Sequence, residues 1–173
     1  MSNPVCKIAR ETGTDVPLQC LFGCSRNCAE EDEAGLRVII AGSRSVTQYE
    51  YVRHAMQVFR ENCGQGPFVR VVSGCARGVD KLGERWAREN GVTVKHFEVS
   101  SLEWVAAPRT AGHRRNGRMA EYATHLVAIW DGKSGGTADM VRKAKLRGLC
   151  VLVANIATGQ YEFTPATAQT VPR

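Results

Sequence analysis

Short apolar runs that stop at a glycine alternate with helical patterns along this chain, and this alternation restricts the fold more than any other feature of the sequence. Residues 36–42, LRVIIAG, and residues 68–74, FVRVVSG, are rich in β-branched residues and end in glycine. After the first run, Val52, Ala55 and Phe59 follow at helical spacing. Such alternation predicts parallel strands, because each helix returns the chain to the same end of the sheet.

The pattern extends over most of the chain and predicts an α/β fold, a Rossmann-like open parallel sheet of about five strands flanked by helices. The expected strands are residues 36–42, 68–74, 92–99, 125–130 and 149–154. The expected helices are residues 47–63, 79–89, 115–123 and 137–147. Thr47 and Glu50 have the spacing of a capping box at the first helix, and residues 100–112 are expected to form an irregular connection.

A chain of 173 residues fits one domain with appendages. Residues 1–35 lack sustained periodicity and hold four of the seven cysteines, so they are expected to form an N-terminal cysteine-containing appendage. Residues 36–155, which carry the alternating pattern, are expected to form the main domain. Residues 156–173 are expected to form an extended or partly disordered C-terminal tail without a chemical role.

Charge is distributed unevenly and predicts an anionic partner. The net charge is +6, but residues 1–35 hold three basic and six acidic side chains, which leaves 20 basic and 11 acidic ones in the remainder. Such a surface favours a nucleotide or a nucleic acid, and a solvated basic surface is the alternative. No apolar stretch approaches the roughly 20 residues of a membrane span, so no membrane partner is expected. The N-terminal residues lack the pattern of a secretory signal, which predicts a cytoplasmic protein with reduced cysteines.

Two glycine-bearing turns follow the first two expected strands. In AGSR, residues 41–44, the backbone N–H groups and the Arg44 guanidinium can hold a phosphate, although an ordinary strand-to-helix turn has the same pattern. In SGCARGVD, residues 73–80, two glycines flank a bend of small residues that opens a helix, as a close approach to pyrophosphate requires. Asp80 there can bind a ribose hydroxyl or complement the helix dipole. Cys75 is interpreted as a small turn residue rather than a nucleophile.

Two further segments carry groups suited to a nucleotide. Residues 109–118 bring four arginines, a histidine and an asparagine into one short stretch, where Arg115 can hold an anion and Asn116 can contact a base or ribose. A solvated basic loop without a specific ligand is the alternative. WDGKSGGT, residues 130–137, places Asp131 at a strand end and Thr137 at a helix start, where its hydroxyl can cap the helix or contact phosphate. Trp130 can stack on a base or belong to the core.

The N-terminal cysteines are candidate metal ligands. Cys20, Cys24 and Cys28 recur every four residues, so a helix would place them on one face, and Cys6 can supply a fourth thiolate. Zinc or an iron–sulfur cluster suits such ligands. The spacing differs from the common C-x2-C pattern, and small apolar side chains without a metal are the alternative.

Residues 37–153 resemble the SLOG superfamily of Rossmann-like domains, which includes the Smf/DprA and Lonely-guy proteins, and most closely its YspA-like branch. The resemblance rests on AGSR, SGCARGVD, GHRRNGRMAEYA and WDGKSGGTADM. It implies a nucleotide or nucleotide-derived ligand at the carboxyl ends of the strands. Together with Asp131, the candidate ligand-binding residues are Gly42, Ser43, Arg44, Gly74, Arg77, Gly78, Asp80, Arg115, Asn116, Gly135, Gly136 and Thr137.

Three functions remain open, of which binding or sensing of a nucleotide is preferred. Lonely-guy hydrolases carry a catalytic glutamate after a PGGxGT turn, whereas this chain has Met140 there, so hydrolysis of a glycosidic or phosphate bond is the alternative. Asp80 or Glu121 would then have to substitute. Single-stranded nucleic-acid binding ranks third, because no cluster of aromatic residues suggests base stacking. SLOG relatives often pair, which makes a homodimer a further expectation.

Overall fold

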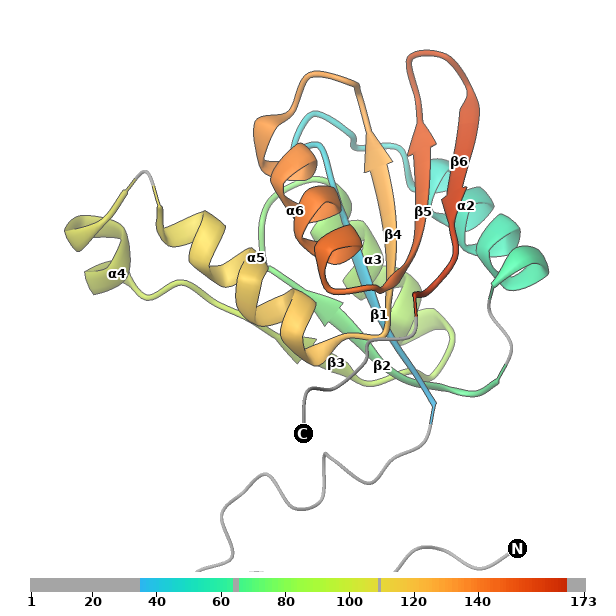
Figure 1. Cartoon of the computed structure of the whole chain (residues 1–173), viewed down its shortest axis with the longest axis horizontal. Coiled ribbons are helices and arrows are strands. Elements are labelled where there is room, and N and C mark those ends of the chain that lie inside the picture. Colours follow the sequence, from blue (N-terminus) through green and yellow to red (C-terminus); the bar gives the residue numbers. More distant parts are fainter. Residues whose placement is uncertain (1–34, 64–65, 109, 168–173) are drawn as a thin grey trace, which may run out of the picture. The chain divides into compact units, whose positions relative to one another are not determined.

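The computed structural model describes residues 35–63, 66–108 and 110–167, and these form an α/β fold (Figure 1). Six strands make one sheet in the order β3-β2-β1-β4-β5-β6. The first five pair in parallel, and β6 pairs antiparallel with β5. The strands are β1 (Leu36–Gly42), β2 (Phe68–Ser73), β3 (Val94–His96), β4 (His125–Trp130), β5 (Cys150–Asn155) and β6 (Gln160–Thr164).

Helices cover both faces of the sheet, as the buried strands require. α2 (Tyr49–Asn62) and α3 (Val79–Glu89) pack on one face, and α5 (Ala111–Tyr122) and α6 (Gly135–Leu146) pack on the other (Figure 1). In β1, Val38 and Ile40 belong to the first core, whereas Ile39 belongs to the second. Because successive side chains of a strand point to opposite faces, a run that is apolar throughout is buried on both sides. The predicted α/β class is confirmed.

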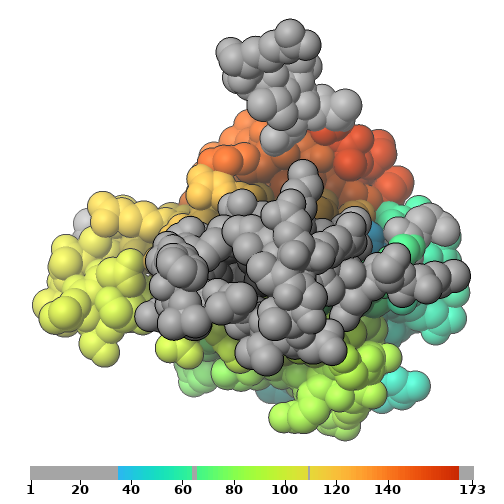
Figure 2. Space-filling model, turned by 90° about the horizontal axis from the view of Figure 1, so that it is seen from below, coloured from blue at the N-terminus to red at the C-terminus, as the bar shows by residue number. Residues whose placement is uncertain are grey.

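The connection expected over residues 100–112 is instead partly helical. α4 (Ser101–Ala106) begins with a capping box, in which Ser100 and Glu103 satisfy each other's backbone N–H groups. α5 begins at Ala111, one turn before the expected start. Leu102 and Val105 of α4 are more than four-fifths exposed, so this helix of six residues buries no apolar face and is too short for a clear helical pattern. α4 and the first turn of α5 lie at one side of the domain in both perpendicular views (Figure 1, Figure 2).

Several expected boundaries also change. Part of the segment expected as a C-terminal tail forms β6, whose exposed residues are held by backbone pairing with β5. The third strand is shorter than expected, at three residues. The capping box predicted at Thr47 and Glu50 is wrong, because Gln48 is the N-cap of α2 and the Glu50 carboxylate instead bonds Arg53.

The N-terminal appendage, with the candidate metal ligands Cys6, Cys20, Cys24 and Cys28, lies outside the described residues. None of the helices in the described part of the chain combines the length and the apolar character that a bilayer span requires.

Candidate functional site

A cleft lies where the strand order reverses. β1 is flanked by β2 on one side and by β4 on the other, so the loops that follow β1 and β4 diverge at the carboxyl edge of the sheet. Between them is a hollow of about 400 Å³, here called the first hollow. Its lining residues are Ala41, Gly42, Arg44, Ser45, Ala76, Asp80, Arg115, Asn116, Met119, Asp131, Ser134, Gly136, Thr137 and Met140.

A second hollow, of about 420 Å³, adjoins the first and shares Arg44, Ala76 and Arg115 with it. It extends toward β3 and α4. Its other lining residues are Gly74, Cys75, Arg77, Lys81, Glu98, Val99 and Trp104.

Most of the residues predicted from the sequence meet at these two hollows. The first hollow brings together eight of them, Gly42, Arg44, Asp80, Arg115, Asn116, Asp131, Gly136 and Thr137. Gly74 and Arg77 line the second. Ser43, Gly78 and Gly135 line neither hollow.

Ser43 has a structural part in joining the turns after β1 and β4. Its side chain is fully buried, its backbone N–H donates to the Ile129 carbonyl at 3.0 Å, and its hydroxyl accepts from the Asp131 N–H at 3.1 Å. Gly42 lies equally close to β4, because a Cβ atom there would lie 2.0 Å from the Ile129 carbonyl oxygen. The AGSR turn therefore presents Arg44 and its backbone to the cleft, and it uses Gly42 and Ser43 to pack the two strand ends together.

The bend after β2 packs against the same turn. Gly78 has a φ of +79°, and a Cβ atom there would lie 2.6 Å from the Ser43 carbonyl oxygen, so only glycine fits. The Asp80 carboxylate accepts from the Ala76 N–H inside the bend at 3.3 Å. Burial raises the pKa of Asp80 to about 6, although nearby Arg115 opposes that rise. Asp80 is therefore a buried acid that titrates close to neutrality at the wall of the cleft.

Arg115 is the basic group that borders both hollows. Its Nη1 donates to the Gly74 carbonyl, its Nη2 donates to Asn116 Oδ1 at 3.2 Å, and a Cβ atom on Gly74 would touch the guanidinium. Within the described residues, Arg115 Nε is a buried nitrogen without a hydrogen-bond partner. Burial and the like charge of Arg44 lower the pKa of Arg115, against the attraction of Asp80. An anion beside Arg115 would offset both effects.

Asn116 acts mainly as a connector between helices. Its amide nitrogen donates to Asp139 Oδ2 at 3.0 Å and to the Gly136 carbonyl at 3.3 Å, while its oxygen accepts from Arg115. Both amide hydrogens are thus used inside the protein, so the amide orients Arg115 rather than presenting a donor to a base or ribose.

Asp139 holds this connector in place from α6. It is 7% exposed and accepts from Asn116, Arg142 and Lys143, and His113 Nδ1 lies 3.0 Å away. Burial alone would raise its pKa, but hydrogen bonds led by those from Lys143 and Asn116 outweigh burial and lower it to about 2. Asp139 is therefore an ionised link between α5 and α6.

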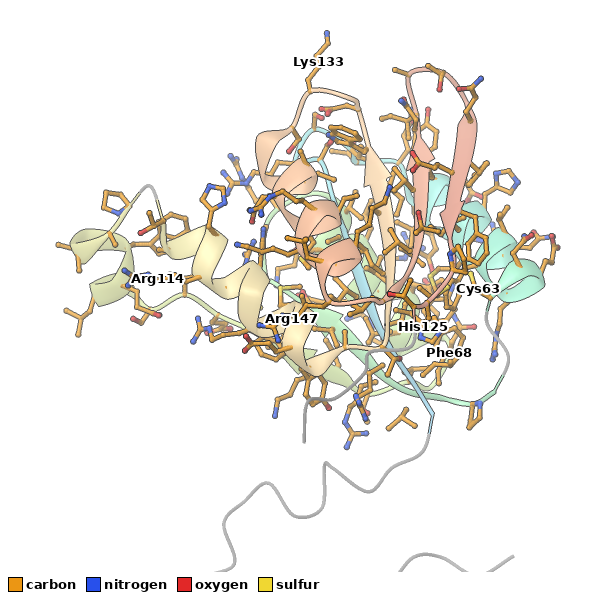
Figure 3. All side chains as sticks on the ribbon, in the orientation of Figure 1. Cys63, Phe68, Arg114, His125, Lys133 and Arg147 are labelled. Atoms are coloured by element: carbon orange, nitrogen blue, oxygen red, sulfur yellow. The ribbon has the colours of Figure 1, made fainter. Side chains whose placement is uncertain are left out.

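The turn after β4 places the N-terminus of α6 at the first hollow, which Gly136 and Thr137 line. Asp131 Oδ1 accepts from the N–H groups of Lys133 and Ser134 at 2.9 Å each, and these bonds lower the pKa of Asp131 to about 2. Lys133 extends away from the domain at the tip of the turn (Figure 3). Among the described side chains none caps the first turn of α6, which contains two glycines and no acidic residue. These N–H groups can therefore receive an anion.

Several lining residues were not among the sequence candidates. Ser45 directly follows AGSR, and Ser134 is the first residue of SGGT, so the predicted motifs border the one and contain the other. Trp104 is 39% exposed at the second hollow, and the Ser-x-x-Glu spacing at Ser100 and Glu103 was the signal for its helix. Trp130, the candidate stacking residue, instead packs beside the second core and donates its Nε1–H to the Ser134 carbonyl.

The residues considered for catalysis differ in whether they line the cleft and in whether their side chains can act as an acid or base. Met140 is 2% exposed and lines the first hollow, so a thioether stands where the resemblance to Lonely-guy hydrolases would require a carboxylate. Glu121 lies outside both hollows and bonds Arg147. Burial and nearby Glu84 raise the pKa of the Cys75 thiol, which disfavours a thiolate nucleophile. Asp80 is thus the titratable carboxyl most suited to acid–base chemistry in the cleft.

Comparisons with known proteins agree with this architecture. Gene 61 protein of Mycobacterium phage D29 is 31% identical over 121 residues, which cover 67% of this chain and 94% of that protein. The structure of DNA processing protein A (DprA) from Streptococcus pneumoniae matches with a TM-score of 0.54 and 16% identity over 69% of this chain, so the likeness concerns the fold. The match spans half of the DprA chain. The family described as YspA, cpYpsA-related SLOG matches residues 36–104. The chain therefore belongs to the YspA-related SLOG family.

Proposed function

We propose that this domain binds a nucleotide or nucleotide-derived ligand across the two hollows, with its phosphate beside Arg115. The observation that carries the proposal is the position of Arg115. Its guanidinium is held by Gly74 and Asn116, borders both hollows and keeps a buried Nε without a partner in the described structure. A positioned, partly desolvated cation beside an open hollow is suited to an anionic ligand.

Phosphate is the anion that the surrounding groups favour. Arg44 approaches from the turn after β1, and the first-turn N–H groups of α6 face the same hollow at Gly136 and Thr137. Two guanidinium groups and a helix N-terminus can share several phosphate oxygens, whereas one carboxylate would engage only part of them. Asp80 and Asp131 also line the hollow, so they are available to face hydroxyl groups of a ribose.

The nucleobase is assigned to the second hollow. Trp104 offers a partly exposed indole there, and Gly74 and Arg77 line the same hollow. Stacking on an aromatic ring stabilises a bound base by about 1–3 kcal/mol. Because Arg115 borders both hollows, a phosphate at Arg115 leaves room for a base on the Trp104 side.

The test is calorimetric titration of the full chain with AMP, ADP, GMP and UMP, after mass spectrometry for any co-purified nucleotide. Arg115→Ala should weaken binding about 10- to 100-fold, since a charge-assisted hydrogen bond contributes about 1.5–3 kcal/mol. Arg114→Ala is the matched control, because Arg114 is exposed on the side of α5 next to α4 and lines neither hollow (Figure 3). Equal affinity in the Arg115→Ala protein, with its fold intact, would contradict the site.

A second candidate function is hydrolysis of the bound nucleotide, and Asp80 is the observation that favours it. A carboxyl group whose pKa is about 6 can donate or accept a proton near neutral pH. Chromatography of each nucleotide after incubation would detect a released base or phosphate, and Asp80→Asn should abolish that release. Intact nucleotide after prolonged incubation would support binding alone.

A nucleic-acid partner is tested by titration with oligonucleotides of increasing length and at increasing salt concentration. Affinity that rises with oligonucleotide length and falls with salt concentration would favour such a partner.

A further inference from the structure

Three side chains of types that bind transition metals lie together, and one of them, Cys75, also lines the second hollow. They are Cys75 from the bend after β2, Glu84 from α3 and His96 from the end of β3, and their ligand atoms all lie within 4.8 Å of one another. None of the three was a site candidate in the sequence. We propose that Cys75, Glu84 and His96 form a binding site for a divalent zinc-type ion, separate from the N-terminal cysteines and beyond the proposed nucleotide function.

The fold brings these three residues together from distant positions in the chain. Ser73 and His96 are register partners at the carboxyl ends of β2 and β3, so the imidazole lies beside the start of the bend. Glu84 lies on α3, which packs over β2 through the first core. Cys75 has a φ of +62°, a conformation that side-chain-bearing residues seldom adopt and that costs about 1 kcal/mol or more.

Ser73 orients two of the three proposed ligands. Ser73 is 1% exposed, and its hydroxyl donates to Glu84 Oε1 at 2.7 Å and accepts from the Cys75 N–H at 3.0 Å. Buried partners of this kind commonly fix the direction of metal ligands. Oε1 of the carboxylate is therefore held by the interior, while Lys81 Nζ donates to both oxygens, to Oε1 at 3.1 Å and to Oε2 at 2.9 Å.

The ligand set fits zinc better than a hard cation. Thiolate, imidazole and carboxylate are its three usual protein ligands, whereas Mg²⁺ and Ca²⁺ prefer oxygen. With bonds of about 2.0–2.3 Å, a tetrahedral zinc ion holds its ligand atoms about 3.3–3.8 Å apart, so modest side-chain rotations would close the observed spacing. Three protein ligands leave one position for water or another donor, and one of those ligands, Cys75, lines the second hollow.

The groups around the cluster are compatible with a dication. His96 Nε2 lies 3.6 Å from Glu84 Oε1, and Lys81 Nζ lies 2.9 Å from Glu84 Oε2, so a cation already occupies the outer side of the carboxylate. Lys81 is 56% exposed and can turn into solvent when a metal binds. Glu98 acts on both Cys75 and Lys81 through its charge and adds a second carboxylate nearby.

The experiment uses the full chain with Cys6, Cys20, Cys24 and Cys28 replaced by serine, so that the N-terminal thiols cannot contribute. Titration with Co²⁺ should produce a thiolate-to-cobalt absorption band, and equilibrium dialysis should retain one equivalent of Zn²⁺. Cys75→Ser should abolish the band, and Glu84→Gln and His96→Asn should weaken Zn²⁺ binding about tenfold or more. Circular dichroism verifies that each variant is folded.

Three matched substitutions test whether the effect belongs to this cluster. Cys63→Ser, Glu89→Gln and His54→Asn replace the same residue types elsewhere in the domain, and they should leave metal binding unchanged. Cys63 lies with His125 and Phe68 at the amino-terminal edge of the sheet (Figure 3), opposite the bend that carries Cys75. Absence of the cobalt band, or equal Zn²⁺ affinity in the Cys75→Ser and Cys63→Ser proteins, would overturn the proposal.

Discussion

Two pairs of glycines in this domain look alike in the sequence but differ in their surroundings. Gly42 and Gly78 lie in turns where the backbones of neighbouring loops touch, so a Cβ atom at either would lie less than 3 Å from other atoms. At Gly135 and Gly136, at the start of α6, a Cβ atom would meet no atom within 4 Å. The first pair therefore serves packing, whereas the second leaves open space, which Gly136 borders at the first hollow.

This difference shows how the domain separates stability from binding. The loops after β1 and β2 are fixed by close backbone contact, by Ser43 and by the buried Asp80. The start of α6 is held by Asp131 and Asn116, and its N–H groups remain directed to the hollow. Substitutions on the packed side should change the free energy of unfolding, and substitutions on the open side should change ligand affinity.

The largest effect is expected for Gly42→Ala. Its Cβ atom would lie 2.0 Å from the Ile129 carbonyl oxygen and 2.7 Å from Val79 Cγ2, so β1 or β4 must shift. Overpacking of this kind costs about 3 kcal/mol or more, which lowers the melting temperature by about 10 °C. Gly117→Ala in α5, where a Cβ atom meets nothing within 4 Å, is the control and should be neutral or stabilising. Equal melting temperatures for the two variants would refute the packing argument.

Asp80→Asn should change how stability depends on pH. The folded state holds the Asp80 proton up to about pH 6 and the unfolded state only up to about pH 3.8, so the wild type loses stability as pH rises through that window. The variant lacks this loss, which corresponds to about 3 kcal/mol for a pKa shift of about two units.

Urea unfolding at pH 4 and pH 7.5 measures the effect of Asp80. The free energy of unfolding of Asp80→Asn, relative to that of the wild type, should be higher at pH 7.5 than at pH 4. Glu61→Gln changes an exposed carboxylate, and its free energy of unfolding should equal that of the wild type at both pH values. A stability difference between Asp80→Asn and wild type that is the same at both pH values would mean that Asp80 does not titrate in this range.

Gly74→Ala probes the boundary between the packed and the open side. The new Cβ atom would lie 2.7 Å from Arg115 Cζ, and a guanidinium at the end of a flexible side chain can move away. We expect stability to fall by less than in Gly42→Ala, and nucleotide affinity to fall about tenfold because Arg115 loses its position. A thermal melt measures the stability, and calorimetric titration measures the nucleotide affinity. Unchanged affinity would mean that Arg115 does not contribute to ligand binding.

The smallest effect is expected for Gly136→Ala. A methyl group there would enter the open space of the first hollow without touching the protein, so the melting temperature should stay constant or rise slightly. Nucleotide affinity should fall about threefold to tenfold, since the methyl group would occupy ligand volume and hinder approach to the α6 N-terminus. The same titration on Gly117→Ala shows the effect of a helical alanine outside the cleft. A stability loss in Gly136→Ala without an affinity loss would reverse the assignment of this glycine.

Prediction from the sequence succeeded where local pattern decides structure. β1, β2, β4 and β5 begin and end within one residue of expectation, because β-branched runs bounded by glycine identify buried strands. The predictions for residues 100–112 and for the tail were incomplete. α4 has six residues and exposes Leu102 and Val105, and β6 exposes the apolar residues of its alternating sequence QYEFT and is held by pairing with β5, so neither was identified by a buried apolar run.

The sequence by itself determined the order of the five parallel strands and of the four helices that cover the sheet, the SLOG family and the turns that reach the cleft, since these follow from short-range spacing of glycine, arginine and apolar residues. Only the tertiary structure decided what each side chain does there. In the folded domain Ser43 is buried and the Asn116 amide donates to Asp139. Arg115 lines both hollows, and Trp104 lines the second one. Burial and hydrogen-bond partners depend on groups brought together from distant parts of the chain, and local pattern does not contain that information.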